Sequence, residues 1–463
     1  MAKLLQTIYN NSPDLLNEVK TFIARGEDLS VVTEYCESAL SVSSNNGRFD
    51  VVWLLLENGA DGKQLGWTPT FYEVAFGDLD SIRKSINTHR DLEARDNWSR
   101  TPWLLSLQVG DIDKAALLLE SGADQSVAGR CGKTPMAYCI QHNDVAMLQR
   151  LIEQGFDIEA VDEFQTTPLM VAAEAGMAEC VKLLIEAGAD ISKSNDIPER
   201  AIQMASTMEV VQLLVDAGED INDINEDTHA AMLGTEVDGT PTVTRQQYLK
   251  GKYRQFGKTN PQLMDNPYWL SMIKCGANAW GARSTYDDEN GLNDKPVWCY
   301  QRFGRTLNKL PGGRIIEIAG EHEDNYDPDF CIYNDITVFH PDGRIELYGY
   351  PQSVFPPTDN HSATLVGDTI YIIGNLGYHD KRHLGRTPVY KLDIHTYQIE
   401  KVDTTGPQPG WIYRHKARFD GSNTITLSTG EIMLSKDSYM ENHRVYTLNL
   451  DTMEWGEKTE DSR

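Results

Sequence analysis

A Thr-Pro pair that returns every 33 residues constrains the fold of the first half of this chain more than any other feature. The pairs are Thr68-Pro69, Thr101-Pro102, Thr134-Pro135 and Thr167-Pro168. Self-similarity at a fixed period of about 20 to 50 residues is typical of arrays in which each unit buries its apolar face only against its neighbours. The spacing therefore predicts a stack of small repeated units rather than a domain with one central core.

The clearest copy begins at Thr167 and has the sequence TPLMVAAEAGMAECVKLLIEAGAD. Thr167 can cap a helix whose first residue is Pro168, where the missing amide hydrogen costs nothing. Gly176 ends this helix, and residues 181–185 give the next segment an apolar face. Gly188 then begins a turn, so each unit is predicted to be a helix pair followed by a projecting finger.

This copy resembles the ankyrin consensus at nearly every position, and degenerate copies extend the array in both directions. They end at Gly59-Ala60-Asp61, Gly122-Ala123-Asp124, Gly155-Phe156-Asp157 and Gly218-Glu219-Asp220. The segment before Gly26 is predicted to be an atypical first repeat, since a terminal cap needs a polar outer face. The resemblance implies an ankyrin domain over residues 1–227 with about seven repeats.

The resemblance also implies that a partner binds at the fingertips and the concave helical face. At the 33-residue period the candidate partner-binding residues at the tips are Asn97, Trp98, Arg130, Glu163, Phe164, Asp196 and Ile197. Aromatic residues and arginine dominate binding hot spots, so Trp98, Arg130 and Phe164 are the strongest candidates. The alternative is that Trp98 and Phe164 pack against adjacent fingers.

The composition indicates an ordinary folded protein with an uneven charge. The chain has 463 residues, of which 40% are hydrophobic and 24% charged, and its net charge is -27. Residues 1–250 carry 19 basic and 40 acidic side chains, so most of the negative charge lies there. Such a surface repels nucleic acids and anionic membranes and speeds encounter with a basic protein, although repeat arrays can also simply be soluble and acidic. We therefore expect a basic protein partner, no nucleic acid and no membrane.

Signals for a membrane span, a metal cluster or a familiar catalytic motif are absent. No stretch approaches the roughly 18 consecutive apolar residues that cross a bilayer, and no secretion signal is visible, so we expect a cytoplasmic protein. The seven cysteines are scattered without a C-x-x-C pair, which favours buried thiols. Phosphate-binding loops, nucleophile elbows and kinase motifs are missing. No catalytic residue and no cofactor is predicted.

Residues 228–300 interrupt the repeats with polar and proline-containing runs and are predicted to be a linker or adaptor. Asn266 followed by Pro267 places a capping residue before a favourable first helical residue, so a short helix is expected near residues 266–280. No chemistry is visible in this segment.

From residue 301 the pattern changes to short runs rich in Val, Ile, Thr and Tyr between Asp-Gly, Gly-Asp and Pro-Gly turns, which predicts an antiparallel β domain over residues 301–463. The run HSATLVGDTIYIIG from His361, followed by VYKLD from Val389, resembles a kelch propeller blade. The pattern returns at His415 with VYTLN from Val445. Val389 and Val445 lie 56 residues apart, close to the kelch period of about 50 residues.

The resemblance to kelch is incomplete. The double glycine of the family is reduced, because Gly374 is followed by Asn375 and Gly320 by Glu321. Three convincing blades are found, counting a weaker copy near Gly313, whereas propellers usually close with about four to eight. An open kelch-like sheet, a fourth blade from the preceding segment, and closure by dimerisation are the alternatives. The expected fold is an ankyrin α-solenoid followed by an all-β kelch- or propeller-like domain.

Acidic and histidine residues in the second half are weak candidates for a metal site. They are His322, Glu323, Asp324, His361 and His415. Carboxylates and imidazoles that converge at one end of the domain can bind a divalent metal or act as acid and base. His361 and His415, however, occupy the same place in successive copies, which favours a structural role between sheets.

Together these features favour a protein-binding adaptor over an enzyme. A specific version is an immunity-type inhibitor that occludes a toxin. The alternative function is a metal-dependent enzyme or sugar-binding protein whose site lies in the acidic and histidine loops of the kelch-like domain.

Overall fold

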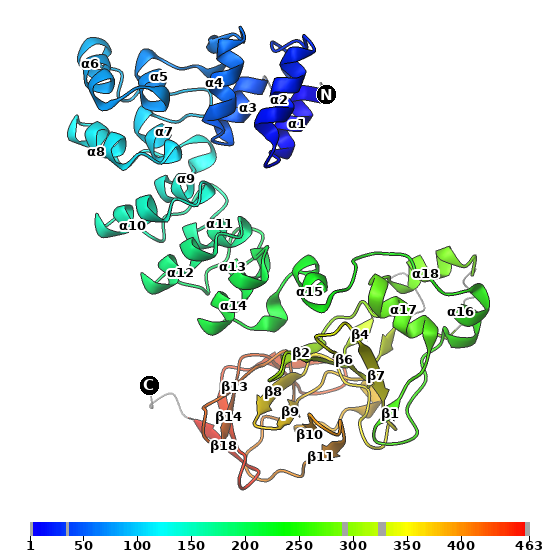
Figure 1. The fold of residues 1–463 in the computed structure, drawn as a ribbon. Helices are drawn as coiled ribbons and strands as arrows, with labels where there is room; N and C mark the ends of the chain where they lie inside the picture. The colour runs from blue at the N-terminus through cyan, green and yellow to red at the C-terminus, as the bar shows by residue number, and fades with distance from the viewer. Residues whose placement is uncertain (1–2, 34–36, 289–294, 323–329, 459–463) are drawn as a thin grey trace. The chain divides into compact units, whose positions relative to one another are not determined.

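The computed structural model describes residues 3–33, 37–288, 295–322 and 330–458. The chain forms two compact units, unit 1 (Met1–Asn225) and unit 2 (Glu226–Arg463) (Figure 1). Each is described by itself. None of the described helices is long and apolar enough to cross a membrane.

Unit 1 consists of helices that follow one another in pairs, coloured from blue to green in Figure 1. Within the described part of unit 1 the seven pairs are α1 (Lys3–Asn10) with α2 (Leu15–Ala24), α3 (Ala39–Asn45) with α4 (Phe49–Glu57), α5 (Pro69–Phe76) with α6 (Leu79–His89), α7 (Pro102–Val109) with α8 (Ile112–Glu120), α9 (Pro135–Gln141) with α10 (Val145–Glu153), α11 (Pro168–Glu174) with α12 (Ala178–Glu186), and α13 (Ala201–Met204) with α14 (Met208–Asp216). Contacts join the first helix α1 to α3, and join α5, α7, α9, α11 and α13 in succession, so these pairs form stacks.

The predicted Thr-Pro signal sets where the first helices begin. The proline is the first residue of α5, α7, α9 and α11. In the last three of these helices, the threonine hydroxyl accepts a hydrogen bond from a backbone amide of the first turn. Thr68 differs, because its hydroxyl donates to the carboxylate of Asp91 instead. The capping argument is therefore confirmed for three of the four pairs.

Leucines at the 33-residue period fill the core of the stack. Leu118, Leu151 and Leu184 lie in the second helices of consecutive pairs, and each is at most 2% exposed. All three belong to one continuous apolar cluster. Burial of such a side chain contributes roughly 1.5 to 3 kcal/mol, so the repeats are held mainly by their neighbours.

Unit 2 begins with a helical segment that was predicted to be a linker. It contains α15 (Glu226–Leu233), α16 (Arg245–Gly251), α17 (Pro267–Cys275) and α18 (Ala279–Thr285). Asn266 caps α17, as the sequence predicts, through hydrogen bonds from the amides of Tyr268 and Trp269. The indole of Trp269 stacks on that of Trp298, with ring centroids 5.0 Å apart. The segment is therefore an integral part of unit 2, because Trp269 packs in the interior of this unit against Trp298.

The β-sheets of unit 2 are antiparallel. A five-stranded sheet has the order β1 (Gln262–Leu263), β7 (Ile345–Gly349), β6 (Ile336–Phe339), β3 (Ile315–Ile318), β2 (Thr306–Lys309). Two four-stranded sheets have the orders β11 (Ile399–Lys401), β10 (Val389–Asp393), β9 (Thr369–Ile373), β8 (Ser362–Val366) and β13 (Lys416–Phe419), β14 (Thr424–Ser428), β17 (Val445–Asn449), β18 (Glu454–Lys458). Smaller sheets join β12 (Trp411–Tyr413), β15 (Glu431–Met433) and β16 (Tyr439–Glu441), and β4 (Glu321–His322) with β5 (Cys331–Ile332).

The three larger sheets share one construction. In each, four strands follow one another as a meander, and the first strands β2, β8 and β13 contact one another in that order. Strand β1, from the helical segment, adds a fifth strand to the first sheet by pairing with β7. The predicted β-rich half is therefore present. No closed ring of sheets is formed by the described strands, so a propeller is not shown.

Candidate functional site

The fingertips of unit 1 are tied to one another through the backbone. The amide of Arg130 donates to the carbonyl of Trp98 at 3.0 Å, and that of Asp196 to the carbonyl of Phe164 at 3.0 Å. The amide of Glu163 donates to the preceding tip in the same way, at 3.1 Å. The predicted tip residues are therefore neighbours along one row.

Polar side chains at the base of each finger fix the turn. One carboxylate oxygen of Asp162 accepts the amides of Phe164 and Thr166, each at 2.9 Å. The amide oxygen of Asn195 accepts the amides of Ile197 and Glu199 at 3.0 and 2.9 Å. Such side-chain turns hold the backbone without using the side chains of the tip.

Two tips present apolar side chains to solvent. Phe164 is 58% exposed and Ile197 is 72% exposed. The acidic neighbours Glu163 and Asp196 are also exposed. An exposed phenylalanine beside an exposed isoleucine, rimmed by acids, has the composition of a small protein-binding patch.

Trp98 and Arg130 are placed differently from Phe164. The indole N–H of Trp98 donates to the carbonyl of Ser41 at 2.8 Å, which leaves the ring half-buried. The guanidinium of Arg130 lies 5.2 Å from the centroid of that ring. Asn97 in turn donates its side-chain amide to the carbonyl of Gln64 at 2.8 Å. Asn97 and Arg130 thus join neighbouring fingers, and Trp98 joins its finger to helix α3.

A buried ion pair below the Trp98 finger was not predicted from sequence. Arg100 and Asp96 have fully buried side chains, 2.6 Å apart. Arg100 also donates to the hydroxyl and carbonyl of Ser44, and Asp96 accepts the indole N–H of Trp67 at 3.3 Å. A buried charge needs this degree of pairing, and the pairing links residues from different repeats.

Lys133 lies next to this charged cluster. Its ammonium is 4.1 Å from the centroid of the Tyr138 ring. Burial, together with the nearby charge of Arg100, lowers the pKa of Lys133 to about 7. The amine is therefore charged below pH 7 and becomes neutral above it, whereas an ordinary lysine keeps its charge to about pH 10.

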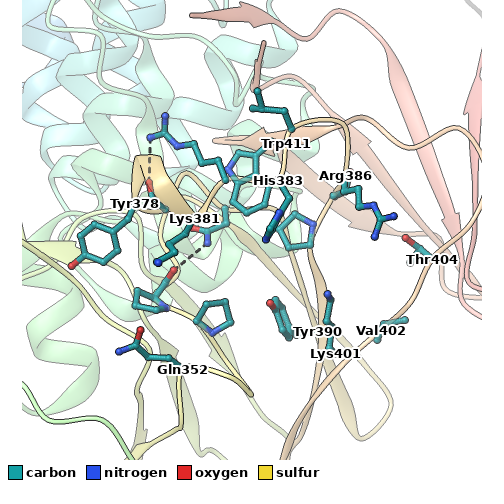
Figure 2. Close-up of a pocket in the computed structure, with 18 of the residues that line it drawn as sticks. Gln352, Tyr378, Lys381, His383, Arg386, Tyr390, Lys401, Val402, Thr404 and Trp411 are labelled. Atoms are coloured by element: carbon teal, nitrogen blue, oxygen red, sulfur yellow. Dashed lines mark hydrogen bonds between the residues drawn. The ribbon is translucent and has the colours of Figure 1, made fainter. Parts of the chain in front are cut away.

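Unit 2 contains an open pocket of about 1080 Å³, which we name the basic pocket (Figure 2). Three regions line it: residues 352–357 before β8, residues 375–390 from the loop after β9 into β10, and residues 401–411 from the end of β11 to the start of β12. Its charged lining residues are Lys381, Arg382, Arg386, Lys401 and Asp403, and the imidazole of His383 also lines it. Sequence analysis did not identify this site, because its residues come together only through the order of the strands.

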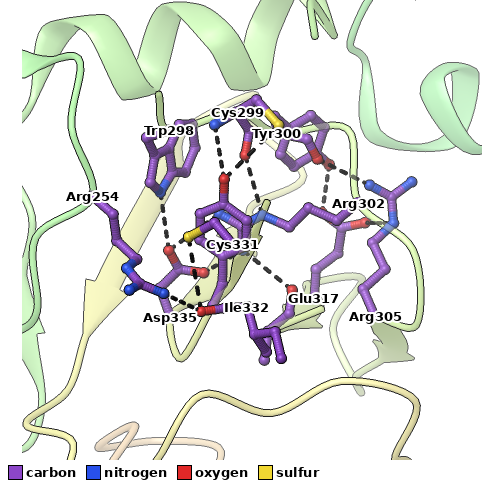
Figure 3. A network of polar contacts seen from close by, with 12 residues as sticks. Arg254, Trp298, Cys299, Tyr300, Arg302, Arg305, Glu317, Cys331, Ile332 and Asp335 are labelled. Atoms are coloured by element: carbon purple, nitrogen blue, oxygen red, sulfur yellow. Dashed lines mark hydrogen bonds and ion pairs between the residues drawn. The ribbon is translucent and has the colours of Figure 1, made fainter. Parts of the chain in front are cut away.

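A second polar network lies in the interior of unit 2 (Figure 3). Arg302 forms a buried ion pair with Asp335, whose carboxylate also accepts the indole N–H of Trp298 at 3.2 Å. The guanidinium of Arg302 lies 3.5 Å from the centroid of the Tyr333 ring. Every member of the pair is satisfied, which is the condition for burying charge without a large penalty.

Glu317 is the centre of a neighbouring buried cluster. Its carboxylate accepts hydrogen bonds from His229 of α15, at 2.6 Å, and from the hydroxyl of Tyr300. Arg305 lies 3.4 Å away. Burial opposes ionisation, but the charges of Arg305 and His229 outweigh it and lower the pKa of Glu317 to about 2. The cluster joins a helix to a sheet.

The histidines proposed as weak metal candidates serve the packing of sheets. His361 bonds through Nε2 to the hydroxyl of Thr306, and His415 through Nε2 to that of Ser362, each at 2.8 Å. Each bond joins the start of one sheet to the start of the next. Burial lowers the pKa of His361 to about 3 and that of His415 to about 4, so both are neutral at pH 7.

The acidic loop gives no metal cluster within the described residues. His322 pairs with Cys331 between strands β4 and β5, and its Nδ1 lies 3.3 Å from the carbonyl of Gln301. Glu323 and Asp324 lie outside the described residues. In the part of the chain that the structure describes, no three His, Cys, Asp or Glu side chains gather to hold a metal ion.

The cysteines that the structure describes include no disulfide. Cys139, Cys180, Cys275, Cys299 and Cys331 are buried free thiols, and Cys131 is exposed. Burial raises the pKa of Cys180 and of Cys331 to about 11. These two thiols are therefore protonated at pH 7, which disfavours a nucleophilic role for them.

Comparison with known proteins identifies the repeats of unit 1. Residues 103–195 and 141–225 match the family described as Ankyrin repeats (3 copies). The solved ankyrin repeat domain of Bcl-3, a unique member of the IkappaB protein family, is 24% identical over 46% of this chain and 96% of that chain, with a TM-score of 0.29. No curated protein matches the chain. The family match therefore places ankyrin repeats within residues 103–225 of unit 1.

Proposed function

We propose that this protein binds a protein partner through the ankyrin fingertips and the concave face of unit 1. The exposed pair Phe164 and Ile197 on adjacent tips carries this proposal. Their backbones are fixed by side-chain turns and by the hydrogen bond from Asp196 to Phe164, so a partner meets an ordered surface. Binding to a preorganised surface avoids the cost of ordering loops.

The partner is proposed to be basic. The negative charge concentrated in the first half of the chain, and the exposed Glu163 and Asp196 beside the apolar pair, support this choice. Charge complementarity speeds association, and screening by salt weakens it. A partner whose association rate does not change between low and high salt would contradict a basic surface.

The test begins with a pull-down from the host, followed by calorimetry with the purified captured protein. Phe164→Ala with Ile197→Ala is expected to weaken binding at least tenfold, since hot-spot residues contribute 2 kcal/mol or more, roughly a thirtyfold change. The matched control is Phe303→Ala with Leu263→Ala, a pair of similar exposure in unit 2. Equal effects of the two double variants would place the binding surface elsewhere.

An immunity-type role is a finer version of this proposal. A partner that is an enzyme or toxin would lose its activity when saturated with this chain and regain it with the Phe164 and Ile197 double variant. Retained activity in the saturated complex would support recruitment rather than inhibition. The fingertip surface is common to both versions.

We also propose that the sheets of unit 2 are kelch-like blades in an open arrangement. Three meander sheets whose first strands contact in order, and His361 and His415 in equivalent positions between them, support this. Light scattering after gel filtration separates the alternatives. A dimer would favour closure by a second copy, and a monomer would favour an open β unit.

A further inference from the structure

We propose that the basic pocket of unit 2 binds a small organic anion. Arg386 and Lys401 would hold its phosphate or carboxylate group, and Tyr390 and Trp411 would contact its planar or apolar portion. This proposal goes beyond partner binding by unit 1 and does not depend on it.

The sign of the charge in the pocket is opposite to that of the protein. The chain carries a net charge of -27, yet the pocket lining includes Lys381, Arg382, Arg386 and Lys401 against Asp403 as its one carboxylate. A concave surface lined by charges of one sign focuses the field on the space it encloses. The pocket therefore favours an anion, whereas the surrounding protein does not.

Two of these cations already have roles within the fold. Lys381 pairs with Asp380 at 3.1 Å, and Arg382 donates to the carbonyls of Leu376 and Gly377. The side chains of Arg386 and Lys401 make no ion pair or hydrogen bond with other described residues. They are thus available for a ligand, and a planar guanidinium suits the geometry of a phosphate or carboxylate.

The strand register places a hydroxyl beside one of these cations. Lys401 of β11 is the cross-strand partner of Tyr390 of β10, and both line the pocket (Figure 2). Directly opposed residues in an antiparallel pair project on the same face of the sheet. Burial raises the pKa of Tyr390 to about 12, so its hydroxyl stays protonated and can donate a hydrogen bond to an anion.

An aromatic wall completes the pocket. The indole N–H of Trp411 donates to the carbonyl of Leu376 at 3.0 Å, which fixes the ring. The ring of His383 lies edge-on to it, with centroids 6.3 Å apart. Ligand sites commonly combine such apolar walls with a few convergent polar groups. A ligand with both an anionic group and a ring would use every part of this lining.

A small anion fits these features better than a nucleic acid does. Residues 226–463 carry 25 basic and 33 acidic side chains, so the phosphates of a polymer that extends beyond the pocket would meet a unit of net negative charge. A compact anion enters the local positive field without that penalty. The volume of about 1080 Å³ is ample for a ligand of this size.

Calorimetric titration of the full chain with phenyl phosphate, benzoate and the uncharged phenyl glucoside tests the proposal. Phenyl phosphate or benzoate should bind saturably, and phenyl glucoside at least tenfold more weakly. The better of the two anions identifies the ligand group as phosphate or carboxylate. Arg386→Gln with Lys401→Gln should weaken anion binding tenfold or more, because both charge-assisted contacts are lost.

The matched control is Lys416→Gln with Arg418→Gln, which removes the same charge from exposed positions on β13. It should leave anion affinity within twofold of wild type. Absence of saturable binding by both anions would overturn the proposal, as would equal weakening by the two double variants. Since all four substituted side chains are exposed, circular dichroism should show every variant folded.

Discussion

The two units bury charge in different ways. In unit 1 the buried ion pair joins Arg100 to Asp96, four residues away, and the partners that come from earlier repeats, such as Ser44 at 56 residues away, are neutral. In unit 2 the charged partners themselves come from distant segments, since His229 and Glu317 are 88 residues apart and Arg302 and Asp335 are 33 apart. A repeat array is held by neighbours, so its units can open separately. In unit 2 long-range polar pairs add to the buried apolar clusters, so removing one pair should affect strands that are distant in the chain.

The largest effect is expected at Arg302. Arg302→Ala would leave the buried Asp335 carboxylate without its cation, which costs about 3 to 5 kcal/mol. Because a chain with two compact units need not unfold in a single step, hydrogen exchange in β3 and β6 is the appropriate measurement. Protection should fall throughout the sheets of unit 2 while that of unit 1 is unchanged.

A double variant sharpens this prediction. Replacing both partners, as Arg302→Met with Asp335→Leu, removes the unpaired charge as well as the pair, and such replacements are often neutral. It should recover most of the stability lost in the single variant. A single variant that loses less than about 1 kcal/mol would show that the pair is not needed for unit 2.

In unit 1 we expect the next largest effect, from Leu184→Ala in the apolar cluster of the repeats. Leu184 is fully buried, and shortening a buried leucine costs about 2 to 5 kcal/mol. The loss of hydrogen-exchange protection should be greatest in α10, α12 and α14 and fall towards α1. A uniform loss of hydrogen-exchange protection over all helices of unit 1 would contradict the proposed difference between the two units, because it would show that the repeats unfold together.

Acid should weaken unit 2 through Glu317. Its pKa is lowered to about 2 from an ordinary value of 4.5, so its ionised form stabilises the folded state above pH 4.5. That contribution is lost as the pH falls from 4.5 towards 2. Glu317→Gln should therefore be less stable than wild type by about 1 to 2 kcal/mol at pH 7, with a difference that shrinks below pH 4.5. Denaturant titrations at pH 7, 4 and 3 check this; a constant difference would contradict it.

The difference between local features and contacts of distant segments also decides which parts of the structure could be predicted from the sequence. The 33-residue period locates the helix pairs and the fingertips, because caps, turns and apolar faces are local features of each repeat. The helix that follows Asn266 could be predicted for the same reason, because its cap is formed by neighbouring residues. By contrast, the packing of residues 226–285 into unit 2 and the basic pocket depend on contacts between distant segments. No spacing in the chain signals that Arg386, Lys401 and Trp411 line one space.

The roles of His361 and His415 could be predicted only in part. Their repeated position favoured a structural role between sheets, and the bonds from His361 to Thr306 and from His415 to Ser362 join sheets in this way. The partner hydroxyls, however, lie more than 50 residues from each histidine in the chain. A repeat can therefore indicate the kind of role while the partner appears only in the fold.

The smallest effect on stability is expected at the fingertips. Phe164 and Ile197 are 58% and 72% exposed, and the turns beneath them are held by Asp162 and Asn195. Surface substitutions of this kind usually change stability by at most about 0.5 kcal/mol. Phe164→Ala with Ile197→Ala should therefore unfold in denaturant as wild type does. Trp98→Ala should be less stable than this double variant, because the indole N–H is bonded to the carbonyl of Ser41. Equal stabilities for the two variants would mean that the bond from Trp98 to Ser41 of α3 does not stabilise unit 1. Trp98 would then be a candidate for partner binding in the same way as Phe164.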